Sequence, residues 1–457
     1  MRKLISFFLL IPVIAFSQTF IDVGFDNSDS LKKVTITPFF SSHISVSDDG
    51  EGDKTTNFLA YGTNVYARLS PRLQLSSRIL KINGDFNTAL SDYVDSLGVF
   101  PGMNTIEDNR LSYFSLVADY KISKYFSARL GKGNNFIGNG YRSMLLSNNH
   151  AAYPFLSFVT EFWKVKYYNY YTTFSDIYSA DISQKKHGAF HYLDYSVNKR
   201  LTVGIFEGII WQAQDENYER GYDIHYLNPI IFYRPVEFSK HSPDNALMGL
   251  NLNYSLNTTN IYGQILLDDL NINRYDNTEN GFFQNKFALQ VGVRSRLSIK
   301  EHKIHLLAEY NQAQPYTYAH KHPMQNYTHM NQALAHPLGA NFKETVFMVN
   351  HRFKRWSTNL KYTYAIYGAD SLDTHYGQNI FISDFLAQGE GGEFSYGNYN
   401  GQGIKTELHT LYTELNYDLK VAKVFLAYAL RNKTRDENSN YLVFGIKTNF
   451  LNPFIDF

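Results

Sequence analysis

The chain has 457 residues, a net charge of +1 at neutral pH and no cysteine. The near-neutral charge argues against electrostatic binding to nucleic acid, and the lack of cysteine excludes disulfides, thiolate metal sites and a lipidated N-terminal cysteine. Tyrosine and phenylalanine are abundant, at 36 and 35 residues, and tyrosine is favoured at membrane–water interfaces. The mean hydropathy of −0.33 looks like that of a soluble protein, but a membrane β-barrel has the same polar average because its strands alternate between lipid and lumen.

The N-terminus has the order of a secretory signal. Arg2 and Lys3 form a charged end, an apolar stretch from Leu4 to Ile14 follows, and Ala15 and Ser17 are the small residues of a cleavage site. We therefore predict a signal peptide over residues 1–17; a buried N-terminal strand or helix is the alternative. No later segment approaches the ~20 continuous apolar residues of a membrane helix.

Alternation of apolar and polar residues dominates the rest of the chain. From Phe287 to Ile299, for example, one face is apolar and the other carries Arg294 and Arg296. Successive side chains of a strand point to opposite sides, so the segment reads as a strand with one apolar face. A soluble sandwich would bury that face in a core, whereas a barrel would place it against lipid.

Segments of this kind predict an all-β fold, a transmembrane antiparallel up-and-down barrel of about 18 strands. The expected strands span residues 34–44, 58–69, 73–84, 110–121, 125–133, 153–162, 163–174, 188–197, 201–212, 247–257, 259–268, 285–299, 303–313, 343–354, 356–367, 404–418, 421–431 and 440–450. Strand parity requires a tight turn between Glu161 and Lys164. An even count places both termini in the periplasm.

Short polar connections alternate with long ones along the chain, as in outer-membrane barrels with short periplasmic turns and long extracellular loops. The long loops are expected at 45–57, 85–109, 134–152, 175–187, 213–246, 269–284, 314–342, 368–403 and 432–439. No linker marks a second domain. The predicted organisation is a signal peptide (1–17), a short periplasmic segment (18–33) and an outer-membrane barrel (34–457).

Catalytic motifs are missing from the sequence. It has no Gly-x-Ser-x-Gly and no His-Glu-x-x-His pattern, so we expect neither an enzyme nor a cofactor. A metal site on the loop histidines is a weaker alternative, because no carboxylate accompanies them at ligand spacing. These histidines are His320, His322, His329 and His336.

Charged and aromatic side chains offer two further candidates. Inward charges could pair across the lumen as structural groups or line a path for a solute; the expected ones are Glu207, Arg294, Arg296, Glu309, Lys361 and Glu414. Loop tyrosines among Asn and Gln could stack on sugars or belong to the membrane girdle. They are Tyr316, Tyr318, Tyr327, Tyr396 and Tyr399.

Four segments carry a family resemblance: Gly131 to Ser143, Tyr226 to Phe238, Ser242 to Ala246 and Ala335 to Glu344. Together they resemble the RemB-like gliding-motility barrels and the Wzi-like capsule-assembly barrels of Bacteroidetes, over most of the mature chain. The resemblance implies a cell-surface role in motility or in polysaccharide attachment. It implies outer-membrane lipid, surface polysaccharide and motility or secretion proteins as partners, with no nucleic acid.

The Gly-rich segment 131–140 and the Pro-rich segment 228–243 are poor strand material but rich in aromatic and amide residues. We expect them to fold inward and to constrict the lumen. The predicted ligand-binding and loop-anchoring residues are Arg142, Arg234, Glu237, His336 and Asn341. The favoured function is a non-enzymatic barrel for surface attachment, gliding motility or export; a channel for a small solute or oligosaccharide is the alternative.

Overall fold

The computed structural model describes most of the chain from residue 33 to residue 448. The described residues are 33–48, 53–85, 91, 94, 100, 102–103, 106–107, 110–179, 182–214, 220–230, 244–269, 281–371, 374–388, 395–435 and 438–448. The predicted signal peptide and nearly all of the segment that follows it lie outside these residues. So do two of the predicted site residues, Arg234 and Glu237.

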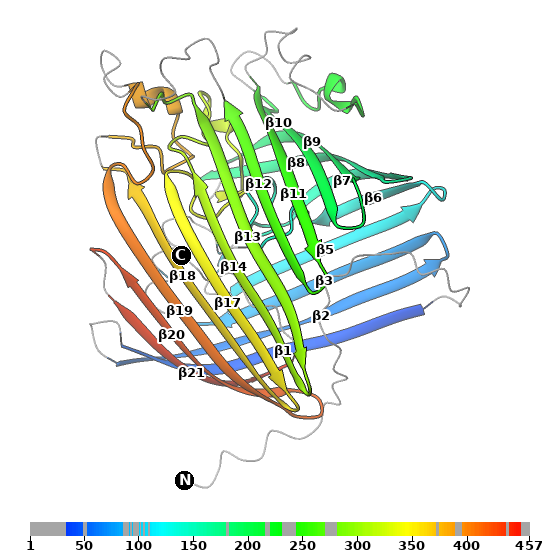
Figure 1. The fold of residues 1–457 in the computed structure, drawn as a ribbon, viewed down its shortest axis with the longest axis vertical. Helices are drawn as coiled ribbons and strands as arrows, with labels where there is room; N and C mark the ends of the chain where they lie inside the picture. The colour runs from blue at the N-terminus through cyan, green and yellow to red at the C-terminus, as the bar shows by residue number, and fades with distance from the viewer. Residues whose placement is uncertain are drawn as a thin grey trace.

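Eighteen long strands form a closed antiparallel barrel, as predicted (Figure 1). Each strand pairs with its neighbour in the chain, and the last pairs with the first, with Ser41 opposite Lys447. The strands are β1 (Lys33–Asp48), β2 (Asp53–Ser70), β3 (Leu73–Gly84), β5 (Arg110–Lys121), β6 (Phe126–Gly133), β7 (Tyr153–Phe162), β8 (Val165–Ser179), β9 (Ile182–Ser196), β10 (Leu201–Gln212), β11 (Asn245–Leu256), β12 (Thr259–Asp269), β13 (Lys286–Ile299), β14 (His302–Ala313), β17 (Phe342–Phe353), β18 (Trp356–Ala369), β19 (Ile404–Asp418), β20 (Lys423–Lys433) and β21 (Ser439–Lys447).

Three predicted long loops are shorter than expected. β1 and β2 stay paired as far as Asp48 opposite Asp53, and β8 and β9 as far as Ser179 opposite Ile182. The connection predicted at 432–439 also shortens, because β20 ends at Lys433. The apolar pattern ends earlier than the strands do, since the backbone hydrogen bonds of a ladder form equally well between polar residues.

Tight turns join the strands at the opposite end. Four two-residue turns begin with a residue at positive φ: Trp163 (55°), Asn257 (46°), Lys300 (53°) and Lys354 (52°). A positive φ at the first central residue suits the right-handed twist of a hairpin. The turn at Trp163 confirms the predicted break between Glu161 and Lys164.

The register decides which residues face the lumen. Residues directly opposite each other on paired strands share a face, so one assignment propagates around the barrel. Outward positions such as Leu130, Leu250 and Phe444 are exposed and apolar, whereas the inward Gln264 and Gln290 are polar and buried. The wall is therefore apolar outside and polar inside.

Short elements complete the fold. The two-residue strand β4 (Ile106–Glu107) pairs with β5, and β15 (Thr328–His329) pairs with β16 (Gln332–Ala333). The helical segments are the 3-10 turns η1 (Ile224–Leu227), η3 (Pro323–Gln325) and η4 (Asp384–Gln388). Among the described residues, no helix is long and apolar enough to cross a membrane.

Candidate functional site

Arg142, His336 and Glu344 meet inside the barrel. Glu344 projects inward from β17, and its carboxylate accepts from the Arg142 guanidinium at 2.9 Å and from His336 Nε2 at 2.7 Å. All three side chains are buried. Arg142 belongs to the loop 134–152 and His336 to the loop 314–341, so one inward carboxylate holds two loops together.

Backbone groups of loop 134–152 bind the inward face as well. The N–H groups of Tyr141 and Arg142 donate to the carboxylate of Glu309 on β14 at 2.7 and 3.0 Å. The amide of Gln290 on β13 donates to the Arg142 carbonyl at 2.9 Å. Gly140 permits this approach, because a Cβ there would lie 2.3 Å from a Glu309 oxygen. The wall thus supplies the hydrogen-bond partners that this irregular backbone needs.

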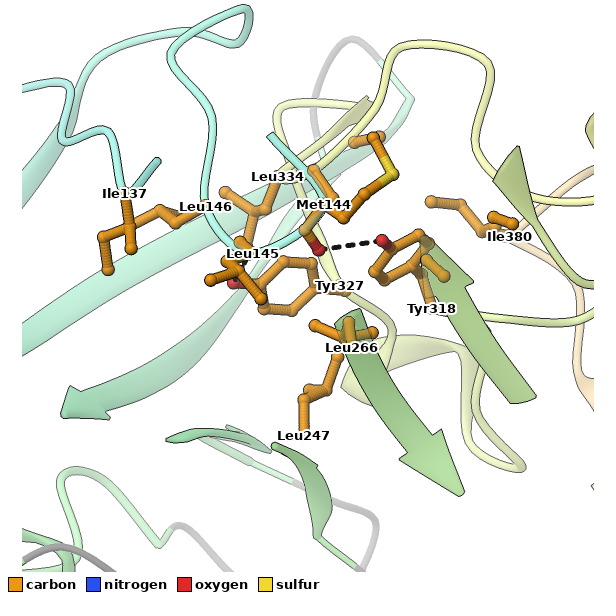
Figure 2. Packing of buried hydrophobic residues seen from close by; sticks show 14 of the residues in the cluster. Ile137, Met144, Leu145, Leu146, Leu247, Leu266, Tyr318, Tyr327, Leu334 and Ile380 are labelled. Atoms are coloured by element: carbon orange, nitrogen blue, oxygen red, sulfur yellow. Dashed lines mark hydrogen bonds between the residues drawn. The ribbon is translucent and has the colours of Figure 1, made fainter. Parts of the chain in front are cut away.

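The apolar side of loop 134–152 packs against loop 314–341 (Figure 2). Met144 and Leu145 are fully buried, and their carbonyls accept from the hydroxyls of Tyr318 at 2.8 Å and Tyr327 at 2.7 Å. Leu334 lies in the same cluster. The two loops therefore form a packed core that is separate from the outward apolar face.

Two buried lysines anchor the loops, and sequence reasoning did not single them out. Lys186 on β9 donates to Asp176 at 2.6 Å and to the side chain of Asn326, in loop 314–341, at 2.6 Å. Lys286 on β13 donates to Asp384 in η4 at 2.5 Å. Lysines are almost never fully buried unless they are paired, but a local pattern does not reveal the partner. An inward lysine near the loop end of a strand was the only available signal.

Asn341, a predicted site residue, has a structural environment. Its amide nitrogen donates to the carbonyls of Gly368 and Gln402, each at 3.0 Å, and its oxygen accepts from Gly401 N–H at 2.7 Å. These bonds join β17 to the end of β18 and to the loop that precedes β19. The side chain therefore connects separate backbone segments through hydrogen bonds.

The described part of the Pro-rich segment, residues 228–230, does not fold into the lumen as predicted. Tyr167 and Tyr171 on β8 face outward, and their hydroxyls donate to the carbonyls of Pro229 and Leu227 at 2.6 and 3.0 Å. Residues 227–230 therefore pack on the outside of the barrel, because the outward tyrosines offer the donors that these carbonyls require.

Five of the six expected inward charges do face inward: Arg294, Arg296, Glu309, Lys361 and Glu414. The prediction for Glu207 is wrong. It lies opposite His191 on β9 and Met248 on β11, both on the outward face. A charge pattern cannot distinguish the two faces when a covering segment shields an outward carboxylate from lipid.

The loop histidines do not gather into one site. His320 lies near His322, with ring centroids 6.2 Å apart. His329 lies near His150 instead, and His336 binds Glu344. Burial lowers the pKa of His150 to about 4, although the carbonyls of Ala151 and Ser147 act to raise it. Burial, followed by the nearby His150, lowers the pKa of His329 to about 3.

Both of these rings are therefore neutral at pH 7 and serve as packing groups. Among the residues that the structure describes, no group of three or more His, Asp or Glu side chains could hold a metal ion.

The five loop tyrosines divide into two groups. Tyr316, Tyr318 and Tyr327 are buried, whereas Tyr396 and Tyr399 are exposed, Tyr399 with 64% of its surface. We call these exposed loop aromatics, together with the exposed Phe385, the aromatic rim (Phe385, Tyr396 and Tyr399).

Buried aromatic rings lie against two residues of this rim, Phe385 and Tyr396. The ring of Phe282 lies 5.3 Å from Tyr396, and that of Phe283 lies 6.2 Å from Phe385. The ammonium of Lys321 is 5.0 Å from the Phe385 ring and adds a positive charge. The loop end of the barrel thus presents exposed aromatic rings to its surroundings, the kind of wall that ligand sites combine with a few polar groups.

Comparison with solved structures places this fold among outer-membrane barrels. The chain is similar to Wzi, described as an outer membrane protein involved in group 1 capsule assembly in Escherichia coli and as a carbohydrate-binding β-barrel; the TM-score is 0.57 at 11% identity, covering 90% of this chain and 84% of that one. OpdK from Pseudomonas aeruginosa has a TM-score of 0.48 at 9% identity (91% and 98% covered), and OccAB4 from Acinetobacter baumannii has 0.48 at 9% (92% and 98%). No protein-family model and no curated protein matches the sequence. Identities this low establish the barrel fold alone.

Proposed function

We propose that this protein is a non-enzymatic outer-membrane barrel that binds a surface polysaccharide at its loop end. Its short turns and both termini face the periplasm, and the loop end faces outward from the cell. The apolar outward face suits lipid, since the strands alternate between an apolar outside and a polar inside.

The aromatic rim is the observation that carries this proposal. Its exposed rings, two of which lie against buried aromatic rings, are not part of a packed core, and flat apolar rings with polar neighbours suit the faces of sugars. Lys321 adds a positive charge that would favour an acidic polysaccharide. The similar barrel Wzi is itself described as carbohydrate-binding, which supports the same ligand class here.

The lumen in this proposal is closed by the loops. The contacts of loop 134–152 with Glu309 and Glu344, and its packing against loop 314–341, support closure. A closed barrel would act as a rigid support for the rim. A conducting lumen would instead favour the alternative function, a channel for a small solute or oligosaccharide.

Removal of the rim tyrosines tests the binding function. We expect the double variant Y396A/Y399A to bind polysaccharide from the surface of the source bacterium roughly tenfold more weakly, because aromatic contacts contribute about 0.5–1.5 kcal/mol each and 1.4 kcal/mol is a tenfold change. Isothermal titration calorimetry on the purified barrel measures the change. The control Y125A removes an exposed tyrosine at the short-turn end and should bind like the parent; equal affinity of all three proteins would contradict the proposal.

A role in gliding motility, with motility or secretion proteins as partners, rests on the sequence resemblance. Co-purification from native membranes would test it, because a barrel docked into such a complex would bring that complex with it. Loss of gliding on deletion, with unchanged surface polysaccharide, would favour motility over polysaccharide attachment.

A further inference from the structure

A polar row interrupts the outward apolar face of the wall. Five residues lie opposite one another on consecutive strands: Phe158 on β7, Asn169 on β8, His191 on β9, Glu207 on β10 and Met248 on β11. The two ends of the row, Phe158 and Met248, are 40% and 37% exposed, as expected for side chains that face lipid. The three polar residues between them are buried on the same face.

The segment 220–230, which we call the strap, covers this row. Three consecutive strap carbonyls, those of residues 227–229, accept hydrogen bonds from the wall. Their donors are Tyr171 to Leu227 at 3.0 Å, His191 to Asn228, and Tyr167 to Pro229 at 2.6 Å. Glu207 lies next to His191, with a carboxylate oxygen 4.0 Å from His191 Nδ1. His191 of the polar row and the two neighbouring tyrosines of β8 therefore satisfy an irregular backbone that lies against the outside of the barrel.

The N-terminal half of the strap also binds the outside of the barrel. The indole of Trp211 donates to the Gly221 carbonyl at 3.0 Å, and Arg220 binds Asp244 at the start of β11 at 2.6 Å. The Tyr226 ring is buried against Trp211, with ring centroids 4.9 Å apart, and its hydroxyl donates to Asp244 at 2.7 Å. These contacts make the strap an integral layer on the wall.

The strap exposes three large apolar side chains, beside the exposed polar residues His225 and Asn228. Ile224 and Ile230 are 74% and 68% exposed, and Leu227 is partly exposed between them. Glu207, one member of the covered row, lies at the middle of β10 (Leu201–Gln212), a strand long enough to cross the bilayer. A segment at this height would meet lipid rather than water.

We propose that the strap is embedded in the outer membrane and that Ile224, Leu227 and Ile230 contact lipid acyl chains. The wall-to-carbonyl hydrogen bonds of residues 227–229 support this occupant, because a backbone carbonyl in water needs no protein donor but one in hydrocarbon does. The row also joins lipid-facing positions at both ends. The inference rests on the proposed membrane location.

The lack of native cysteine allows a direct test. Single variants I224C and I230C, labelled with an environment-sensitive fluorophore, are reconstituted in phosphatidylcholine vesicles that contain nitroxide-labelled acyl chains. L250C marks the bare wall and Y399C marks the aromatic rim. We expect quenching at both strap positions to match that at L250C and to exceed that at Y399C several-fold.

Three results would overturn the inference. Quenching at L250C without quenching at the strap would show that the strap lies in water. Self-quenching at the strap that rises with protein density, without quenching by lipid, would show that a second copy of the chain covers it. Unquenched L250C would instead refute the membrane location itself, and with it the proposed function.

Discussion

Glu344 accounts for two loop contacts at once. Its buried carboxylate faces a guanidinium from one loop and an imidazole from another, and Asn311 on β14 donates to it at 3.1 Å. The Arg142 side chain has only 3% of its surface exposed, and the Glu344 carboxylate stabilises its buried charge. A buried pair of this kind is costly to break, because removing one member leaves the other charge uncompensated.

We expect E344Q to lower the free energy of unfolding by about 3–5 kcal/mol, since it removes the buried carboxylate charge that pairs with the Arg142 guanidinium. Denaturant unfolding in detergent micelles measures this. E301Q, which breaks an exposed pair with Lys354 at 3.4 Å, should leave stability nearly unchanged. If the two variants unfold alike, Glu344 does not hold the loops.

At the scale of elements, two loops share a histidine contact. His150 and His329 lie with ring centroids 6.3 Å apart, and burial lowers their pKa to about 4 and about 3 from an ordinary 6.5. The folded state therefore favours the neutral rings. The contribution of these neutral rings to the stability of the fold is fully present above pH 6.5. It is lost as the pH falls from 6.5 toward 3, because the unfolded chain binds these protons first.

The pH dependence of unfolding tests this contact. We expect the stability of the parent protein to fall between pH 6.5 and pH 4, by on the order of 3 kcal/mol for each histidine. The variant H150Q/H329Q should show a flatter profile, whatever its stability at pH 7. Scanning calorimetry at several pH values compares the slopes, and parallel profiles would count against buried neutral histidines.

At the scale of the whole molecule, the packed loops are expected to block the passage of ions through the lumen. Gly133 and Tyr153 are directly paired at the ends of β6 and β7, so a short turn can replace the loop between them without disturbing the wall. We expect the parent barrel to show no open pore in planar-bilayer recordings, and this loop deletion to produce measurable conductance. A large, steady conductance of the parent would show that the lumen is open.

Much of the architecture follows from local pattern. The alternation of side chains predicted all eighteen strands, and the segments 73–84, 153–162, 201–212 and 404–418 match the observed strands at both ends. Parity alone located the turn at Trp163. The candidate site was harder to predict from the sequence. Arg142 and His336 were predicted as site residues, but their shared partner Glu344 was not. The buried lysines Lys186 and Lys286 were not predicted either.

The sequence by itself determined the barrel, because a period-two pattern is written in neighbouring residues and closure of the sheet removes its edges. Only the tertiary structure decided what the loops contact. Arg142 meets Glu344 across 202 positions, and Tyr167 meets Pro229 across 62. Such pairs depend on how strands from distant parts of the chain come together. The same dependence explains why Glu207 faces outward beneath the strap. It also explains why three loop tyrosines are buried while two are exposed.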